Sequence, residues 1–168
     1  MKKRIFSSLF MMAALAMVAM TIAACGGDDD DNNGVDNKIG VHRIDIHYDN
    51  AEECEVMTGF YGIKADGNTS QLYEGGKQLP TDEANTWTSE ELRDYSVSTE
   101  ENSASLNVAI SVSSPNLVPI DKDITVTIVS YINNKRVSTQ VFTLPAGHKV
   151  LTASWSTIST DPGSGYVI

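Results

Sequence analysis

The stretch HRIDIHYD, residues 42–49, holds the densest group of side chains that could do chemistry. If it forms a strand, successive side chains point to opposite faces, so His42 and His47 cannot bind one metal ion together. Arg43, Asp45 and His47 would share a face, where Asp45 and His47 could form a metal or acid–base site. The alternative, which we favour, is the solvated face of a half-buried strand that carries local ion pairs.

The remaining acidic residues and the thiol give no catalytic pattern. Adjacent carboxylates at 52–53, 90–91 and 100–101 diverge on a strand, whereas a glycosidase needs two carboxylates held across a sugar. Cys54 lies between two glutamates whose charges would raise its pKa, and no Gly-x-Ser-x-Gly motif is present. We therefore expect no enzyme, no cofactor and no metal centre, with a small envelope hydrolase as an alternative.

Aromatic residues offer a binding hypothesis. Tyr73, Trp87 and Tyr95 lie in a glycine-rich, acidic part of the chain, where exposed rings could stack on sugar faces. The alternative is that these rings fill the core, as aromatic side chains more often do. Trp155 closes an alternating run and is expected in the core.

The N-terminal residues have the pattern of an export signal. Three basic residues at 2–4 precede an apolar run of about 16 residues, and a helix that spans a bilayer needs about 20. Small residues follow, so residues 1–24 are predicted to be a cleaved signal peptide. An uncleaved anchor helix is the alternative.

The motif Ile22-Ala23-Ala24-Cys25 resembles the lipobox of bacterial lipoproteins. The resemblance implies a diacylglycerol thioether on Cys25, cleavage before it, and acylation, for example with palmitate, of the new amino terminus. Two or more acyl chains anchor a protein stably, since each buried CH₂ contributes about 0.8 kcal/mol. A Cys25–Cys54 disulfide in an exported protein is the competing interpretation.

Residues 25–38 are predicted to be a disordered acidic tether, because they have too few apolar side chains to offset their ordering entropy. The aspartates at 28–31 resemble the acidic export signals of Bacteroidetes surface lipoproteins, which implies a cell-surface location on the outer membrane. Cleavage before Cys25 removes three basic residues, so the net charge falls from −10 to −13. This charge disfavours nucleic acid as a partner.

Residues 39–168 are predicted to form one all-β domain. Apolar and polar residues alternate over 103–113, 123–132, 136–144 and 149–155, as in half-buried strands. Asn133-Asn134 suits a tight turn. Earlier strands are expected at 41–48 and 55–64, with weaker candidates at 70–73 and 95–99. A single helical turn is expected at 88–94, with Thr88 as its cap and Trp87 packed on Leu92.

Strands of this number and spacing predict an antiparallel β-sandwich, with a small closed barrel as the alternative. Residues 118–155 resemble the second half of immunoglobulin-like modules in Bacteroidetes surface lipoproteins. The resemblance implies a non-enzymatic module that binds a glycan or a protein, or serves a structural role. A subunit of an adhesive or secretion assembly that uses edge-strand pairing is the alternative.

Overall fold

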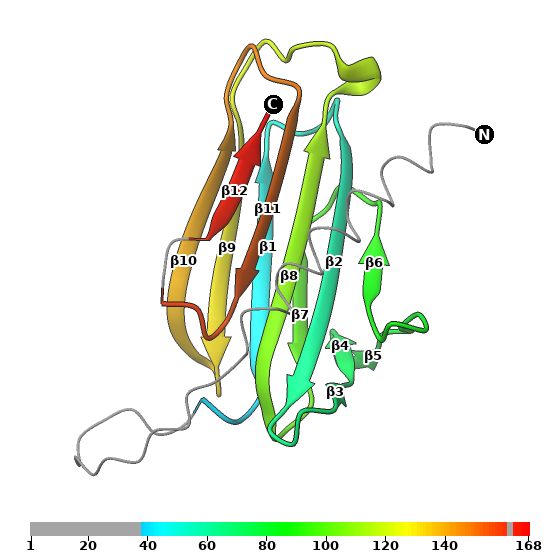
Figure 1. The fold of residues 1–168 in the computed structure, drawn as a ribbon, viewed down its shortest axis with the longest axis vertical. Helices are drawn as coiled ribbons and strands as arrows, with labels where there is room; N and C mark the ends of the chain where they lie inside the picture. Colours follow the sequence, from blue (N-terminus) through cyan, green and yellow to red (C-terminus); the bar gives the residue numbers. More distant parts are fainter. Residues whose placement is uncertain (1–37, 161–162) are drawn as a thin grey trace.

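The computed structural model describes residues 38–160 and 163–168, which form two antiparallel sheets packed face to face (Figure 1). The sheets do not close into a barrel, so the prediction of two packed antiparallel sheets is confirmed. The predicted signal peptide and all of the predicted tether except Lys38 lie outside the described residues. No helix within the described ranges is long and apolar enough to cross a membrane.

The first sheet, here called the β1 sheet, has the strand order β10-β9-β1-β7-β4-β5. Its strands are β10 (Lys135–Leu144), β9 (Ile124–Ile132), β1 (His42–Asp49), β7 (Tyr95–Thr99), β4 (Leu72–Glu74) and β5 (Lys77–Gln78).

The second sheet, the β2 sheet, has the order β12-β11-β8-β2-β3, and β6 also pairs with β2. Its strands are β12 (Ser164–Val167), β11 (Val150–Ser156), β8 (Ser103–Ser113), β2 (Glu55–Lys64), β3 (Thr69–Ser70) and β6 (Trp87–Ser89). A 3₁₀ turn, η2 (Pro115–Leu117), follows β8.

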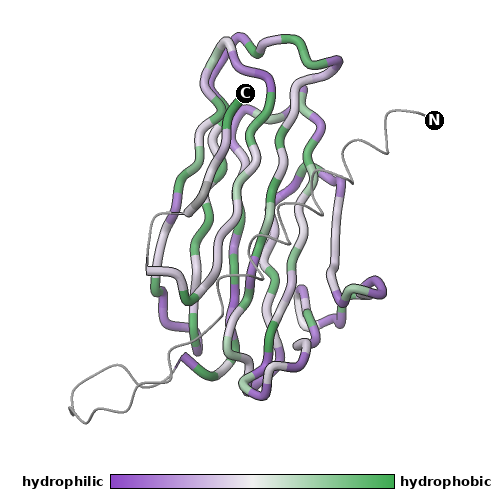
Figure 2. The backbone as a smooth tube through the Cα atoms, viewed as in Figure 1, coloured by the Kyte–Doolittle hydropathy of each residue, from purple (hydrophilic) through white to green (hydrophobic). Residues whose placement is uncertain are grey.

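The core lies between the two sheets and is built from alternate residues of each long strand. Ile44 and Ile46 of β1 face Leu106 and Val108 of β8, and all four are buried. The change from hydrophilic to hydrophobic along each strand is visible in Figure 2. Trp155 is buried as predicted, and its indole N–H donates to Ser130 Oγ at 2.9 Å.

The chain enters the sandwich at the end opposite its C-terminal residue. Gly40 pairs with Ser103, whereas Ile168 bonds to Val150 at the other end. His42 fixes the entry: it is fully buried, Nδ1 accepts from Thr157 Oγ1 at 2.6 Å, and Nε2 donates to the Lys38 carbonyl at 2.7 Å. Because a carbonyl oxygen can only accept a hydrogen bond, Nε2 carries the ring proton and Nδ1 does not.

The strongest sequence predictions agree with the structure. Strands β2, β7 and β8 have the predicted bounds, β9 and β10 begin one residue from the predicted start, and β1 and β11 are shifted by one residue at both ends. Asn133 and Asn134 form the two-residue turn, with φ of 50° and 63°. The weak strand predicted at 70–73 is instead two short strands, β3 and β4.

The helical turn predicted at 88–94 is wrong. Residues 87–89 form β6, and the following loop has no helix. The N–H of Glu91 bonds to Ser89 Oγ instead of to a Thr88 cap. Trp87 packs in an aromatic cluster of the core rather than on Leu92, which is 38% exposed.

Candidate ligand-binding face

Two of the three predicted binding aromatics belong to the core. Tyr95 is 2% exposed, and its ring centroid lies 5.9 Å from that of Trp87 and 6.3 Å from that of Phe60. Trp87 is partly buried at 5.8 Å from Phe60. The core-filling interpretation of these two rings is therefore the one that the structure supports.

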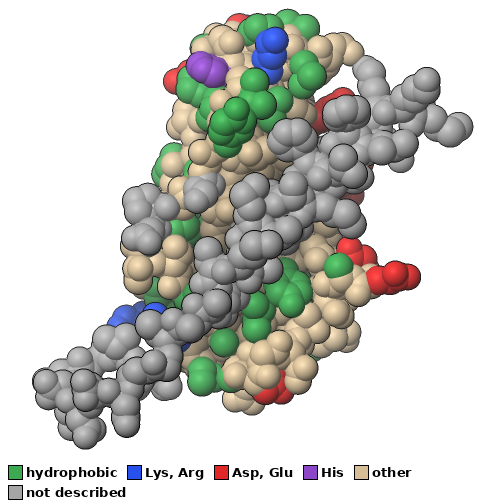
Figure 3. Space-filling model, in the orientation of Figure 1, with side chains coloured by type: hydrophobic (Ala, Val, Ile, Leu, Met, Phe, Trp, Pro, Cys, Tyr) green, Lys and Arg blue, Asp and Glu red, His purple; other side chains and the backbone are tan. Residues whose placement is uncertain are grey.

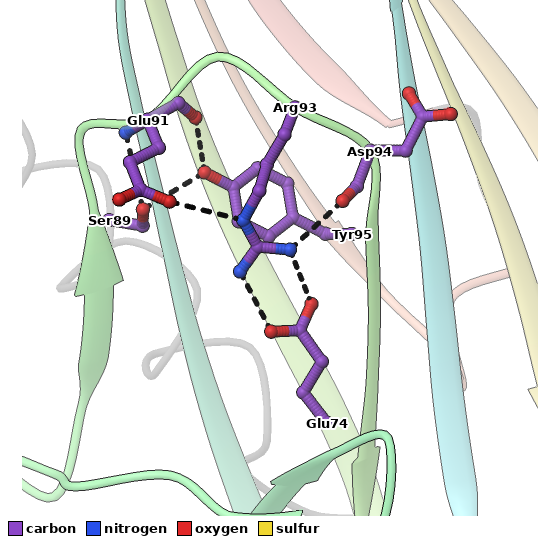
Figure 4. Close-up of polar contacts among 6 residues, drawn as sticks. All are labelled: Glu74, Ser89, Glu91, Arg93, Asp94 and Tyr95. Carbon is purple, nitrogen blue, oxygen red and sulfur yellow. Dashed lines mark hydrogen bonds and ion pairs between the residues drawn. The ribbon is translucent and has the colours of Figure 1, made fainter.

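Arg93 lies over the Tyr95 ring of this cluster (Figure 4). Its Nη1 and Nη2 each donate to a carboxylate oxygen of Glu74 at 2.7 Å, and its guanidinium lies 4.2 Å from the Tyr95 ring centroid. The Tyr95 hydroxyl bonds to Ser89 Oγ and to the Glu91 carbonyl. The two hydrogen bonds from Arg93 lower the pKa of Glu74, so this is a charged clamp that fixes the loop between β6 and β7.

Tyr73 is not part of that cluster. It lies opposite Ser98 of β7 in the ladder, so it shares a face with Ser96 and Ser98, whereas Tyr95 alternates with them and points inward. The predicted sugar platform of Tyr73, Trp87 and Tyr95 is therefore not formed, because Tyr73 lies on the outer face of the β1 sheet, whereas Tyr95 points into the core and Trp87 belongs to the other sheet.

Tyr73 belongs instead to a row of side chains on the outer face of the β1 sheet. The strand registers place one residue from each of the six strands in line, and we call this set the cross-strand row: Arg136, Tyr131, Arg43, Ser98, Tyr73 and Gln78. All six are at least partly exposed. At about 4.8 Å per strand the row extends over roughly 24 Å.

Arg43 lies near the middle of the row and is held in place. Its guanidinium carbon lies 4.0 Å from the Tyr131 ring centroid, and Nε lies 3.2 Å from Asp45 Oδ1. That contact is close enough for an ion pair but is not aligned as a hydrogen bond, and Nε has no hydrogen-bond partner among the described residues. The Nη edge of a guanidinium can bind two oxygens of a ligand at once.

The ion pairs expected on the outer face of β1 are present. Asp45 Oδ1 accepts from Ser96 Oγ at 2.7 Å, and His47 lies between Asp94 at 2.7 Å and Asp49 at 3.1 Å. The bond to Asp94 is the main cause that raises the pKa of His47. Asp45 and His47 thus have separate partners and do not form the acid–base pair considered above.

Cys54 lies in the connection between β1 and β2, is half-buried, and has no disulfide partner among the described residues. Burial is the main cause that raises its pKa, and Glu53 adds to it, so the predicted direction is confirmed. Cys25, the predicted lipidation site, lies outside the described residues.

No family model and no curated protein matches the chain. Its fold is similar to solved structures from Bacteroides and Parabacteroides. A DUF4425 family protein from Bacteroides ovatus matches with a TM-score of 0.63 and 22% identity, over 73% of this chain and 99% of that one. A DUF4425 domain of unknown function from Bacteroides vulgatus matches with a TM-score of 0.59 and 22% identity, over 72% and 95%.

A third similar structure is the calcium-bound form of a protein from Parabacteroides distasonis. It matches with a TM-score of 0.51 and 19% identity, over 83% of this chain and 99% of that one. At these identities the likeness concerns the fold alone. The neighbours are consistent with the predicted resemblance to Bacteroidetes proteins.

Proposed function

We propose that this protein is a lipid-anchored module of the bacterial cell envelope that binds an extended glycan and catalyses no reaction. Its sandwich is of the immunoglobulin-like kind, and the glycan lies on the outer face of the β1 sheet. The observation that carries this proposal is the cross-strand row, which aligns two tyrosines and two arginines on one exposed face.

The direction of the row favours a glycan over a peptide. A peptide usually gains affinity by adding backbone hydrogen bonds to a free sheet edge, but in the middle of a sheet those groups are already paired. Side chains alone must recognise the ligand there. Sugars suit this, since their hydroxyls accept from arginine and glutamine while their CH faces pack on tyrosine rings.

The spacing of the row also fits a sugar chain. A pyranose residue in an extended chain is about as long as one strand spacing, about 4.8 Å. A chain laid across the strands would therefore place one sugar unit over each strand, with Arg43 and Arg136 two units apart. The net charge of −13 after cleavage before Cys25 (−10 less the three basic residues at 2–4) repels polyanions, so we expect a neutral or weakly charged glycan.

We do not propose that this protein binds calcium. Within the described ranges no group of three or more histidine, cysteine or acidic side chains could hold a metal ion, so the calcium of the Parabacteroides protein is not transferred to this chain.

A polysaccharide array tests the proposal with the full-length protein in detergent. We expect Arg43→Gln to weaken binding of the captured glycan about tenfold, because one charge-assisted hydrogen bond contributes about 1.5–3 kcal/mol. Tyr73→Ala should also weaken binding, because it removes a ring on which a sugar would pack. Two matched controls should bind like the natural protein: Lys122→Gln, which removes an exposed charge, and Tyr166→Ala, which removes a ring that is 63% exposed on the other sheet.

The glycan proposal fails if no polysaccharide is retained while one envelope protein co-purifies specifically. Equal losses in the variants and in their matched controls would also contradict it, since the binding face would then not be the cross-strand row.

A further inference from the structure

Within residues 38–160 and 163–168, strand β10 is the long open edge of this sandwich. It is the outermost strand of the β1 sheet and has ten residues, whereas the other edge strands β5, β12, β3 and β6 have two to four. An edge strand presents a line of N–H and C=O groups that can pair with another strand.

Most of β10 lacks the features that prevent an edge strand from pairing with another strand. A bulge between Arg136 and Ser138 and the cations Lys135 and Arg136 protect only its first residues. Residues 138–144 carry no charge and no proline, and Val141 is 59% exposed. Phe142 and Leu144 point into the core and hold the strand rigid.

The charge distribution points to the same flank. The chain has a net charge of −10, so two copies repel each other over most of their surface. Residues 124–160, which form β9, β10 and β11, contain no aspartate or glutamate. In Figure 3 the visible middle of the flank where Figure 1 places β10 is green and tan, with blue at its lower end and red only near its upper end. Two copies can therefore approach through this flank with the least repulsion.

We propose that β10 pairs antiparallel with β10 of a second copy of this chain, across a twofold axis at Val141, and joins the two β1 sheets into one sheet of twelve strands. The register follows from the seven uncharged residues after the bulge, whose centre is Val141. Thr139 then lies opposite Thr143 of the second copy, on the outer face.

The ends of this register are complementary in charge. Continued past the end of β10 at Leu144, this register brings Arg136 of one copy near Ala146 of the other, and the Ala146 N–H donates to Asp123 Oδ1 at 2.7 Å. Lys135 and Arg136, at the start of each β10, thus lie near the loop of the other copy that binds the Asp123 carboxylate. Such an interface is isologous, because each side uses the same residues.

Cysteine crosslinking in membranes of cells that produce the full-length protein tests the pairing and its register. In a Cys54→Ser background, which removes the half-buried thiol, Val141→Cys places two thiols on the axis. We expect mild oxidation to convert most of this variant into a covalent dimer. Thr143→Cys should give little dimer alone, but a strong dimer when co-produced with Thr139→Cys.

Tyr166→Cys on β12 is the matched control, since Tyr166 is equally exposed but lies on the other sheet. The proposal is overturned if Tyr166→Cys dimerises as well as Val141→Cys, or if none of the three β10 positions crosslinks. A product whose mass is not twice that of the monomer overturns it too, because β10 would then pair with another protein. The result does not depend on glycan binding, so the two proposals fail separately.

Discussion

His42 is a buried histidine that joins the entering chain to both sheets. It hydrogen bonds to Thr157 and to the Lys38 carbonyl, and burial is the main cause that lowers its pKa below the ordinary 6.5. The sequence placed this side chain on the face opposite Asp45 and His47, which the structure confirms. Its role is structural, because both ring nitrogens are occupied.

The lowered pKa of His42 predicts a loss of stability in mild acid. As the pH falls below about 6.5, the unfolded chain takes up a proton that the folded protein resists until its lowered pKa, so the free energy of unfolding decreases over that window. His47 acts in the opposite direction: Asp94 raises its pKa, so its contribution is present at low pH and is lost as the pH rises through the raised value.

Urea denaturation at about pH 7.5 and about pH 5.5 measures this effect. We expect His42→Gln to be less stable at the higher pH, by about 1–3 kcal/mol for the lost buried hydrogen bonds, and to lose less stability than the natural protein on acidification. His148→Gln, at an exposed loop position, should keep the natural pH dependence. An unchanged dependence in His42→Gln would show that His42 does not set it.

At the scale of elements, the sequence predicted long strands well and short ones poorly. A strand of nine or more residues repeats its alternation often enough to be recognised, as in β8 and β9. Strands β5, β6 and β12 have two to four residues, and their existence depends on the neighbours they pair with. The prediction of a helical turn at 88–94 failed for the same reason. The local conformation is set by tertiary contacts, namely the Arg93–Glu74 clamp and the packing of Trp87.

The cross-strand row could not be predicted from single strands. The sequence assigned Arg43 to a definite face of its own strand, but which residues of other strands become its neighbours depends on strand order and register. Strands β9 and β1 are adjacent in the sheet although they are far apart in the chain. The sequence does carry a signal for the core position of Tyr95, since Tyr95 alternates with Ser96 and shares its face with Val97.

Close packing between β2 and its edge strand gives a prediction at the scale of elements. A Cβ on Gly62 would lie 2.9 Å from Ser70 Cβ and 3.1 Å from Thr99 Cγ2. We expect Gly62→Ala to lower the free energy of unfolding by about 1–3 kcal/mol through overpacking. Thermal and urea denaturation of the purified protein would measure it.

Ser70→Gly removes the nearest of these atoms and provides the control. In a double-mutant cycle, Gly62→Ala should cost less in the Ser70→Gly background than alone. A cost that is the same in both backgrounds would show that contact with Ser70 does not explain the effect of the alanine.

At the scale of the whole molecule, acidic side chains are concentrated in one part of the sandwich, and the chain enters at one of its two ends. Residues 38–101 carry fourteen acidic side chains, and Figure 3 shows red side chains toward β6. Exposed apolar residues Leu117 and Val118 lie in the loop after β8, at the end opposite to chain entry. A lipid on Cys25 would therefore hold the domain by its entry end and leave the opposite end and the β10 flank free.

Membrane anchoring through Cys25 is the claim on which the proposed location rests, and cell fractionation of Cys25→Ser tests it most directly. The matched control is Cys54→Ser, which changes the other cysteine of the chain. We predict that the natural protein and Cys54→Ser sediment with membranes, whereas Cys25→Ser is released into the soluble fraction. A Cys25→Ser protein that stays membrane-bound, with its N-terminal segment uncleaved, would contradict the lipoprotein assignment.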